Sequence, residues 1–110
     1  MGNAKLRMEY LPMSETAYYM LLSLKDVRHG YGIMQHVEEL TRGRIRLGAG
    51  TVYGTLSRME KDGLIRAVAE QDRRKLYQIT GQGSELLRAE LGRIQELYEY
   101  GRKVRSDFYE

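Results

Sequence analysis

The 110-residue sequence contains no cysteine, a single proline and no long apolar run. Without cysteine there is no disulfide framework, no thiolate nucleophile and no cysteine-built zinc site. The longest unbroken apolar run, residues 17–22, is far shorter than the roughly 20 residues that cross a bilayer, and no signal-peptide pattern is present. At this length, with 42% apolar residues, the chain can form one domain. We therefore expect a single-domain cytoplasmic protein with no membrane role.

Positive charge is scarce in the outer parts of the chain and concentrated in the middle. Residues 42–75 hold nine Lys or Arg against four Asp or Glu, whereas residues 1–41 and 76–110 each have a net charge of −1. A basic segment in an otherwise nearly neutral chain is typical of a surface that meets a polyanion, and nucleic acid is the leading candidate. A charged, solvated face explains the same numbers, so the architecture has to decide.

Three helices are predicted in the first 63 residues from apolar residues at helical spacing. The first has Ser14 as its N-cap, and the second starts near residue 30 and stops at Gly43. The third is predicted over residues 48–63, with a glycine at each boundary. Its inward face consists of Val52, Leu56 and Met59.

Alternating residues after Leu64 predict a β-hairpin that ends at Ile79. The connection lacks an Asn-Gly or Asp-Gly pair, so a tight turn and a loop of about four residues both stay open. Thr80 then caps a final helix predicted over residues 80–105. Such a helix is about 40 Å long and has to project from a domain of this size.

Two apolar stripes run along the predicted final helix, and a projecting stripe costs solubility unless it is covered. The simplest cover is a second copy of the chain across a two-fold axis, so we expect a homodimer. The apolar spacing alternates four and three residues, as in a coiled-coil seam. The expected dimer interface consists of Leu87, Leu91, Ile94, Leu97, Tyr98 and Gly101.

The element order predicts a winged helix-turn-helix, a mainly α fold with a small β-hairpin. In this fold the third helix enters the major groove of DNA and the hairpin reaches the backbone. The outward face of the third helix carries small, hydroxylic and basic side chains, namely Thr51, Gly54, Thr55, Arg58 and Lys61. Tyr53 lies between the two faces, with its hydroxyl available to a phosphate. Arg58 suits a guanine edge.

The predicted hairpin tip adds Arg73, Arg74 and Lys75. Strand alternation prevents all three from pointing the same way unless the turn carries some of them. In the nucleic-acid interpretation they contact phosphates. In the alternative interpretation they are charges that keep a strand edge from aggregating.

Three segments together resemble PadR-type transcriptional regulators: HGYGI at 29–33, LGAGTVYGTLSRMEKDGLI at 47–65 and RRKLYQITGQG at 73–83. The resemblance runs from about Leu11 to Tyr100, and the chain is similar in length to the short branch of the family. Gly54 follows Tyr53 where many members have proline, which makes the start of the third helix less rigid.

The resemblance implies a dimeric repressor that binds double-stranded DNA at a pseudo-palindromic operator. Residues 1–79 correspond to the DNA-binding winged helix-turn-helix domain, and residues 80–110 to a C-terminal dimerisation helix packed on it. The resemblance also implies release from DNA by a cellular stress or a small compound, often aromatic or cationic. Some short members hold planar ligands on a tryptophan between the paired last helices, and this sequence has no tryptophan. Ile94 and Tyr98 occupy that face, either as effector contacts or as ordinary dimer-core residues.

The sequence contains no arrangement that suits catalysis, such as a nucleophile with a base or a phosphate-binding loop. Residues 48–50, Gly-Ala-Gly, are too short for a nucleotide-binding loop. His29 and His36 lie seven residues apart with no third ligand nearby, so neither a metal nor another cofactor is expected. The competing interpretation is a winged-helix module that binds an acidic protein and has no operator specificity.

Overall fold

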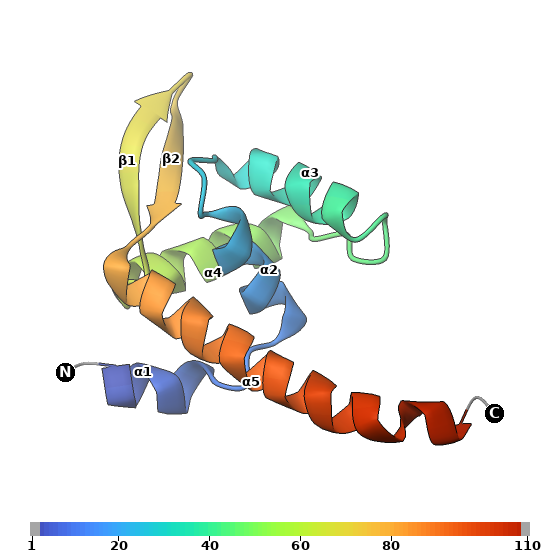
Figure 1. The fold of residues 1–110 in the computed structure, drawn as a ribbon. Helices are drawn as coiled ribbons and strands as arrows, with labels where there is room; N and C mark the ends of the chain where they lie inside the picture. The colour runs from blue at the N-terminus through green and yellow to red at the C-terminus, as the bar shows by residue number, and fades with distance from the viewer. Residues whose placement is uncertain (1–2, 109–110) are drawn as a thin grey trace.

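The computed structural model describes residues 3–108, which are mainly helical with one β-hairpin (Figure 1). The helices are α1 (Asn3–Tyr10), α2 (Glu15–Ser23), α3 (Gly30–Leu40), α4 (Ala49–Lys61), α5 (Gly81–Arg105) and a short 3-10 helix, η1 (Ser106–Phe108). The hairpin consists of β1 (Ile65–Gln71) and β2 (Arg74–Ile79). Helices α2, α3 and α4 followed by the hairpin confirm the predicted winged helix-turn-helix order, and α5 confirms the long final helix.

The hydrophobic core lies where α2, α3 and α4 meet, and the first part of α5 closes it. The three predicted inward residues of α4, Val52, Leu56 and Met59, are at most 1% exposed. Burial of one such side chain contributes about 1.5–3 kcal/mol to folding. The inner face of α4 is therefore fixed by packing, and its outer face stays available for other contacts.

The helix ends confirm the predicted caps of α2 and α4. The Ser14 hydroxyl accepts a hydrogen bond of 3.1 Å from the N–H of Ala17 at the start of α2. Beyond the end of α4, Gly63 has a φ of 78°, and the N–H of Leu64 donates to the carbonyl oxygen of Met59 over 2.9 Å. This reversal needs left-handed backbone, which glycine adopts readily. Helix α4 thus ends at a defined residue, and the chain turns directly into β1.

Thr80 joins three elements at the base of the hairpin. Its hydroxyl donates to the carbonyl oxygen of Gly63 over 2.6 Å, and the same oxygen accepts from the N–H of Gly83 over 3.1 Å. The N–H of Thr80 donates to the carbonyl oxygen of Leu64 over 2.9 Å. The predicted cap of the final helix is confirmed, and it also ties the end of α4 to the start of α5.

The hairpin closes with a tight turn. Gln71 pairs with Arg74, so only Asp72 and Arg73 lie between the strands. Both have positive φ values, 53° and 63°, which is the geometry of a type I′ turn. Of the two connections that the sequence left open, the structure has the two-residue one, although the Asn-Gly or Asp-Gly pair that favours it is missing.

Helix α1 is the one α-helix among residues 3–108 for which the sequence pattern gives no prediction. It packs against α5 and buries Leu6 and Tyr10. These two residues are four positions apart, and the other described side chains of α1 are exposed, so no helical period can be recognised. Helix α1 is therefore stabilised by tertiary packing more than by its own pattern.

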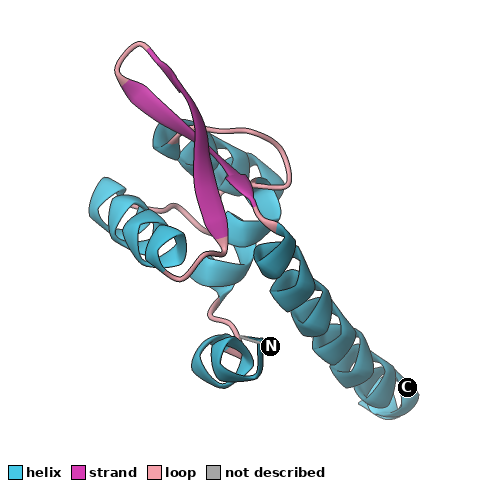
Figure 2. Ribbon diagram, turned by 90° about the vertical axis from the view of Figure 1, so that its left-hand side faces the viewer, coloured by secondary structure: helices cyan, strands magenta, loops and turns pink. Residues whose placement is uncertain are grey.

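Helix α5 has an inner half that is packed and an outer half that is not. Leu86 and Leu87 are buried in the core, whereas residues 95–105 are exposed except for Glu99, and this end of the helix points away from the hairpin (Figures 1 and 2). Its 25 residues span about 37 Å, as the predicted projection requires. Charged residues occur along the whole of α5, and none of the described helices is both long and apolar enough to be a membrane span.

A buried ion pair anchors the inner half of α5 to the linker between α1 and α2. Glu90 is 1% exposed and accepts hydrogen bonds from the Nε and Nη2 atoms of Arg93 over 2.6 and 2.7 Å. It also accepts from the N–H of Met13 over 3.0 Å. The hydrogen bond from the Arg93 guanidinium lowers the pKa of Glu90, so this buried carboxylate stays ionised.

Candidate nucleic-acid interface

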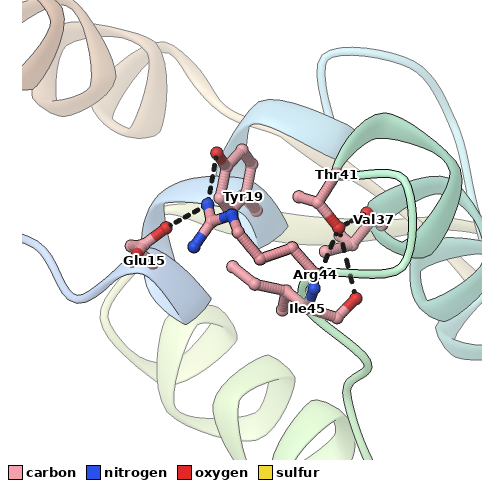
Figure 3. A network of polar contacts seen from close by, with 6 residues as sticks. All are labelled: Glu15, Tyr19, Val37, Thr41, Arg44 and Ile45. Atoms are coloured by element: carbon pink, nitrogen blue, oxygen red, sulfur yellow. Dashed lines mark hydrogen bonds and ion pairs between the residues drawn. The ribbon is translucent and has the colours of Figure 1, made fainter.

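The turn between α3 and α4 is held by polar contacts that fix how α4 is presented (Figure 3). The Thr41 hydroxyl donates to a carbonyl oxygen of α3 over 2.8 Å and accepts from the N–H of Ile45 over 3.1 Å. Arg44 reaches back to α2, 2.6 Å from the Glu15 carboxylate and 3.4 Å from the Tyr19 hydroxyl. The hydrogen bond from Arg44 lowers the pKa of Glu15. The turn is thus tied to both preceding helices.

The outer face of α4 is exposed and carries most of the predicted DNA contacts. Thr51, Gly54, Arg58 and Lys61 are exposed, whereas Thr55 is half-buried. Apart from the adjoining backbone of α4, no atom of residues 3–108 lies within 4 Å of the point where a side chain on Gly54 would begin. A duplex can therefore approach the backbone of α4 closely at its centre.

Two exposed positions on this face are missing from the sequence-based set. Gly50 and Ser57 lie four residues before and three residues after Gly54, so they share its side of the helix, and both are exposed. The helical wheel contains this signal already. We call Gly50, Thr51, Gly54, Ser57, Arg58 and Lys61 the recognition face.

Thr55 and Arg58 border α1, which the sequence pattern does not predict. They line a cleft of about 250 Å³ between α4 and the segment that joins α1 to α2. Glu9, Tyr10 and Pro12 form part of its opposite wall. One edge of the recognition face is therefore bounded by the N-terminal helix.

Tyr53 lies at the edge of α4 away from Thr55 and Arg58, on the side that faces the hairpin. It shares a cleft of about 300 Å³, here called the wing cleft, with His29, Gly30, Arg73, Arg74, Lys75 and Tyr77. The Tyr53 ring packs on Gly30, where a Cβ atom would lie 2.7 Å from the ring. Because Arg73 is in the turn and Arg74 and Lys75 are in β2, all three basic residues line this one cleft in spite of strand alternation.

The hairpin is also attached to the body of the domain. The N–H of Tyr77 donates to the carbonyl oxygen of Arg28 over 2.8 Å, and the N–H of Arg28 donates back over 3.1 Å. Arg28 directly precedes His29, so this bridge holds β2 against the start of α3. The wing cleft consequently has two walls of fixed separation.

The basic residues of the central segment divide into paired and unpaired groups. Arg44 is paired with Glu15 and Arg46 with Glu38, and Arg58 Nε lies 3.9 Å from Asp62 Oδ2. Lys61, Arg73 and Lys75 form no ion pair with any of residues 3–108 and are exposed. These three cations lie at the end of α4 and at the hairpin tip, where a polyanion would be met. Three further arginines of the segment, Arg42, Arg66 and Arg74, likewise form no ion pair with any of residues 3–108.

The two histidines have separate local contacts. His29 caps α3, because its Nδ1 accepts a 3.0 Å hydrogen bond from the N–H of Gly32. His36 Nδ1 lies 2.7 Å from the Ser23 hydroxyl, and burial lowers the pKa of His36. Within residues 3–108 no group of three or more His, Cys, Asp or Glu side chains is placed to hold a metal ion.

The residues predicted for dimerisation differ in what they leave exposed. Leu97 and Tyr98 are 55% and 54% exposed, Leu91 and Gly101 are also exposed, and Ile94 is half-buried. Leu87 is only 8% exposed, because it packs within the core of its own chain. It therefore has little surface left for a partner, and the uncovered stripe begins at Leu91.

The two residues predicted to contact an effector line different hollows of a single chain. Ile94 borders a cavity of about 310 Å³ with Met13, Tyr18 and Tyr19. Tyr98 borders another, of about 380 Å³, near Val104 and Phe108. Within the described residues of one copy, the two side chains thus line separate hollows.

Two curated proteins show local similarity to the chain. It is 39% identical over 62 residues to an uncharacterised 37.1 kDa protein in transposon TN4556 of Streptomyces fradiae, covering 56% of the chain and 17% of that protein. It is 28% identical over 75 residues to the transcriptional regulator YqjI of Escherichia coli strain K12, covering 68% of the chain and 36% of that protein. The chain thus spans well under half of the length of either relative.

Solved structures share the fold over most of the chain. A PadR family transcription regulator from Clostridium difficile R20291 superposes with a TM-score of 0.65 at 26% identity, covering 88% of this chain and all of that one. Bacillus subtilis PadR in complex with operator DNA gives a TM-score of 0.59 at 23% identity, covering 71% of this chain and 47% of that one. The latter likeness concerns the fold.

The model of the PadR-like family of transcriptional regulators matches residues 18–89, well over half of the chain. This range contains α3, α4, the hairpin and the inner part of α5, so it covers both the recognition face and the wing cleft. Members of the family are regulators of transcription and not enzymes. By its sequence and its winged helix-turn-helix fold, the chain belongs to the PadR-like family of transcriptional regulators.

Proposed function

We propose that the protein is a homodimeric repressor that acts in the cytoplasm and binds a pseudo-palindromic DNA operator in a sequence-specific manner. The observation that carries this proposal is the recognition face. It is exposed over three turns of a helix whose other side is fixed in the core, and it contains small and basic side chains but no acidic one. Such a face suits a major groove, in which base edges are read.

Each predicted contact has a role in this proposal. Arg58 reads a base edge, and Thr51 and Lys61 bind phosphates beside it. Tyr53 and the three basic residues at the hairpin tip bind the backbone from the wing cleft. Thr55, being half-buried, contributes at the edge of the face.

The outer half of α5 supports the dimer in this proposal. Its exposed apolar residues continue from Leu91 to Val104, and a coiled-coil-like seam with a second copy would cover them. Two copies related by a two-fold axis present two recognition helices, which explains why the operator should be pseudo-palindromic. Bacillus subtilis PadR, which shares the fold, is known in complex with operator DNA.

Selection of bound duplexes from a random pool tests the proposal. We expect an enriched motif with two-fold symmetry, and an affinity for it at least 1,000-fold above that for random duplex at physiological salt. The Arg58→Ala variant should lose preference at one base pair of each half-site. Weak binding without an enriched motif, abolished by moderate salt, would instead favour a protein-binding module.

We also propose that an aromatic cation releases the protein from DNA by binding near Ile94 and Tyr98 of the paired helices. The rings of Tyr18 and Tyr19 near Ile94 support this ligand class. Tetraphenylphosphonium, titrated into the complex of the protein with a fluorescently labelled operator, should lower the fluorescence anisotropy of the operator because the protein is released. Tetramethylammonium should not. An unchanged anisotropy with both ions, and with a wider panel of aromatic cations, would mean that these residues only form the dimer core.

A further inference from the structure

The N-terminal helix α1 contacts the helix that carries the recognition face. Tyr10, its last residue, is 7% exposed and lies outside residues 18–89, the range that defines the family. The Tyr10 hydroxyl donates a 2.7 Å hydrogen bond to Asp62 Oδ2, across 52 positions of sequence. Asp62 is the C-cap of α4, so Tyr10 is attached to the end of the recognition helix.

The same tyrosine supports Arg58. The Arg58 guanidinium carbon lies 4.6 Å from the centre of the Tyr10 ring, within the range of a cation–π contact. Arg58 Nε lies 3.9 Å from the Asp62 oxygen that accepts the tyrosine hydrogen bond. The ring and the carboxylate therefore hold the guanidinium from two sides, while 59% of the arginine side chain remains exposed.

The hydrogen bond from Tyr10 is maintained over the whole physiological pH range. Burial raises the pKa of Tyr10, and the hydrogen bond to Asp62 raises it further, so the phenol keeps its proton. The Asp62 oxygen that accepts the hydrogen bond from Tyr10 also faces Arg58, but at 3.9 Å it is too far from Arg58 Nε for a hydrogen bond. Arg58 is thus oriented but still available to another partner.

We propose that Tyr10 is a positioning residue for the recognition of DNA, holding Arg58 in the orientation in which it reads a base edge. The inference rests on the proposed function, in which Arg58 contacts DNA. A freely rotating arginine side chain loses conformational entropy when it binds DNA. A side chain that is already held in the binding orientation loses less, so the affinity is higher. Helix α1 then contributes to operator affinity without touching DNA.

A double-mutant cycle on the selected operator tests this role. We expect Tyr10→Leu, which removes both the ring face and the hydroxyl, to weaken operator binding about fivefold. Tyr10→Phe keeps the ring and loses only the hydrogen bond, so a weakening of about twofold is expected. In an Arg58→Ala background neither change should weaken binding further, because nothing remains to be positioned.

Several outcomes would overturn the positioning role. A fivefold loss from Tyr10→Leu that persists in the Arg58→Ala background would show a purely structural effect of α1. If Tyr10→Leu fails to fold, which circular dichroism and thermal unfolding would reveal, Tyr10→Phe supplies the cycle, and an equal loss in both backgrounds has the same meaning. The matched control is Tyr100→Phe, which removes a hydroxyl from an exposed tyrosine on the outer half of α5 and should leave DNA binding unchanged.

A second readout separates this inference from the proposed function. In duplex selection, Tyr10→Leu should relax the same base pair that Arg58→Ala relaxes and no other. A relaxed motif at other positions, or no relaxation, contradicts the role of Tyr10 while leaving sequence-specific binding intact. If the unaltered protein itself enriches no motif, the proposed function has failed, and the positioning role fails with it.

Discussion

The hairpin tip and the outer half of α5 are the two parts of the molecule that extend from its body, and they differ in what they leave uncovered (Figures 1 and 2). At the hairpin the uncovered side chains are cationic, and Arg73 and Lys75 have no anionic partner among residues 3–108. On α5 the uncovered side chains include an apolar stripe among charged ones, with Leu97 and Tyr98 more than half exposed. One end thus suits a polyanion, and the other suits a surface like itself.

The kind of side chain that a region leaves unpaired or uncovered indicates the kind of partner that it binds. A lone cation in water costs little, so Arg73 and Lys75 gain from DNA chiefly by releasing counterions. Exposed leucine and tyrosine gain by leaving water, at about 25 cal/mol per Å² of apolar surface. Binding at the hairpin should therefore weaken with salt, whereas association through α5 should not.

The largest expected effect comes from breaking the apolar end. The double variant Leu97→Glu with Tyr98→Glu places four carboxylates at the proposed seam of a dimer, and we expect a monomer at micromolar concentration in light scattering. Operator affinity should fall by about 100-fold or more because the two half-sites are no longer bound together. The control is Gln95→Glu, which adds charge at an exposed position beside the seam. A variant that stays dimeric would place the interface elsewhere.

The next effect concerns the junction between the two ends. Glu90→Gln removes the charge that accepts hydrogen bonds from Arg93 and Met13, and should lower the free energy of unfolding by about 2 kcal/mol at pH 7 and fixed protein concentration. Because the pKa of Glu90 is lowered in the folded chain, its stabilisation is present above the unfolded value, about 4.3, and is lost as the pH falls further.

Urea unfolding at pH 7 and at pH 3 measures this difference. The gap between the unaltered chain and Glu90→Gln should shrink at the lower pH. Glu96→Gln on the exposed side of α5 provides the matched control and should change neither curve. An equal gap at both pH values would contradict the charged role of Glu90.

A smaller effect is expected from breaking the cationic end. Arg73→Ala with Arg74→Ala should weaken binding about tenfold for every duplex alike and lower the slope of log affinity against log salt by about two. Arg88→Ala removes a positive charge from an exposed site on α5 and serves as the control. An unchanged slope would exclude contact between the hairpin tip and the phosphates.

The smallest expected effect distinguishes the backbone conformation of Arg73 from its charge. Arg73 has a φ of 63°, which glycine adopts without strain, so Arg73→Gly should stabilise the fold by about 0.5–1 kcal/mol, whereas Arg73→Ala should not. Both variants lose the same charge and should weaken DNA binding equally. Thermal unfolding and operator titration measure the two effects, and equal stabilities would contradict the strained turn.

The elements that could be predicted are those whose signals are local. The caps at Ser14 and Thr80 and the glycine after α4 each act within a few residues, and the structure confirms all three. The inward face of α4 follows from a period of 3.6 residues, so its outward face could be predicted as well.

What could not be predicted depends on contacts between distant residues. Helix α1 shows only Leu6 and Tyr10 as an apolar pair, and its position follows from packing on α5. Leu87 fits the apolar seam by spacing, yet the chain's own core already covers it. The support of Arg58 by Tyr10 likewise joins residues 48 positions apart, so no local pattern could reveal it.

The three hydrogen bonds at Thr80 connect the end of α4 rigidly to the start of α5. A tilt of α5 at a dimer interface cannot be absorbed in a loose hinge there, so it moves the recognition helix with it. In the proposed dimer, the crossing angle of the two α5 helices would then set the distance between the two recognition helices, and with it the spacing between half-sites. We expect mutations along the seam to change which operator lengths are accepted, although the seam lies away from the recognition face.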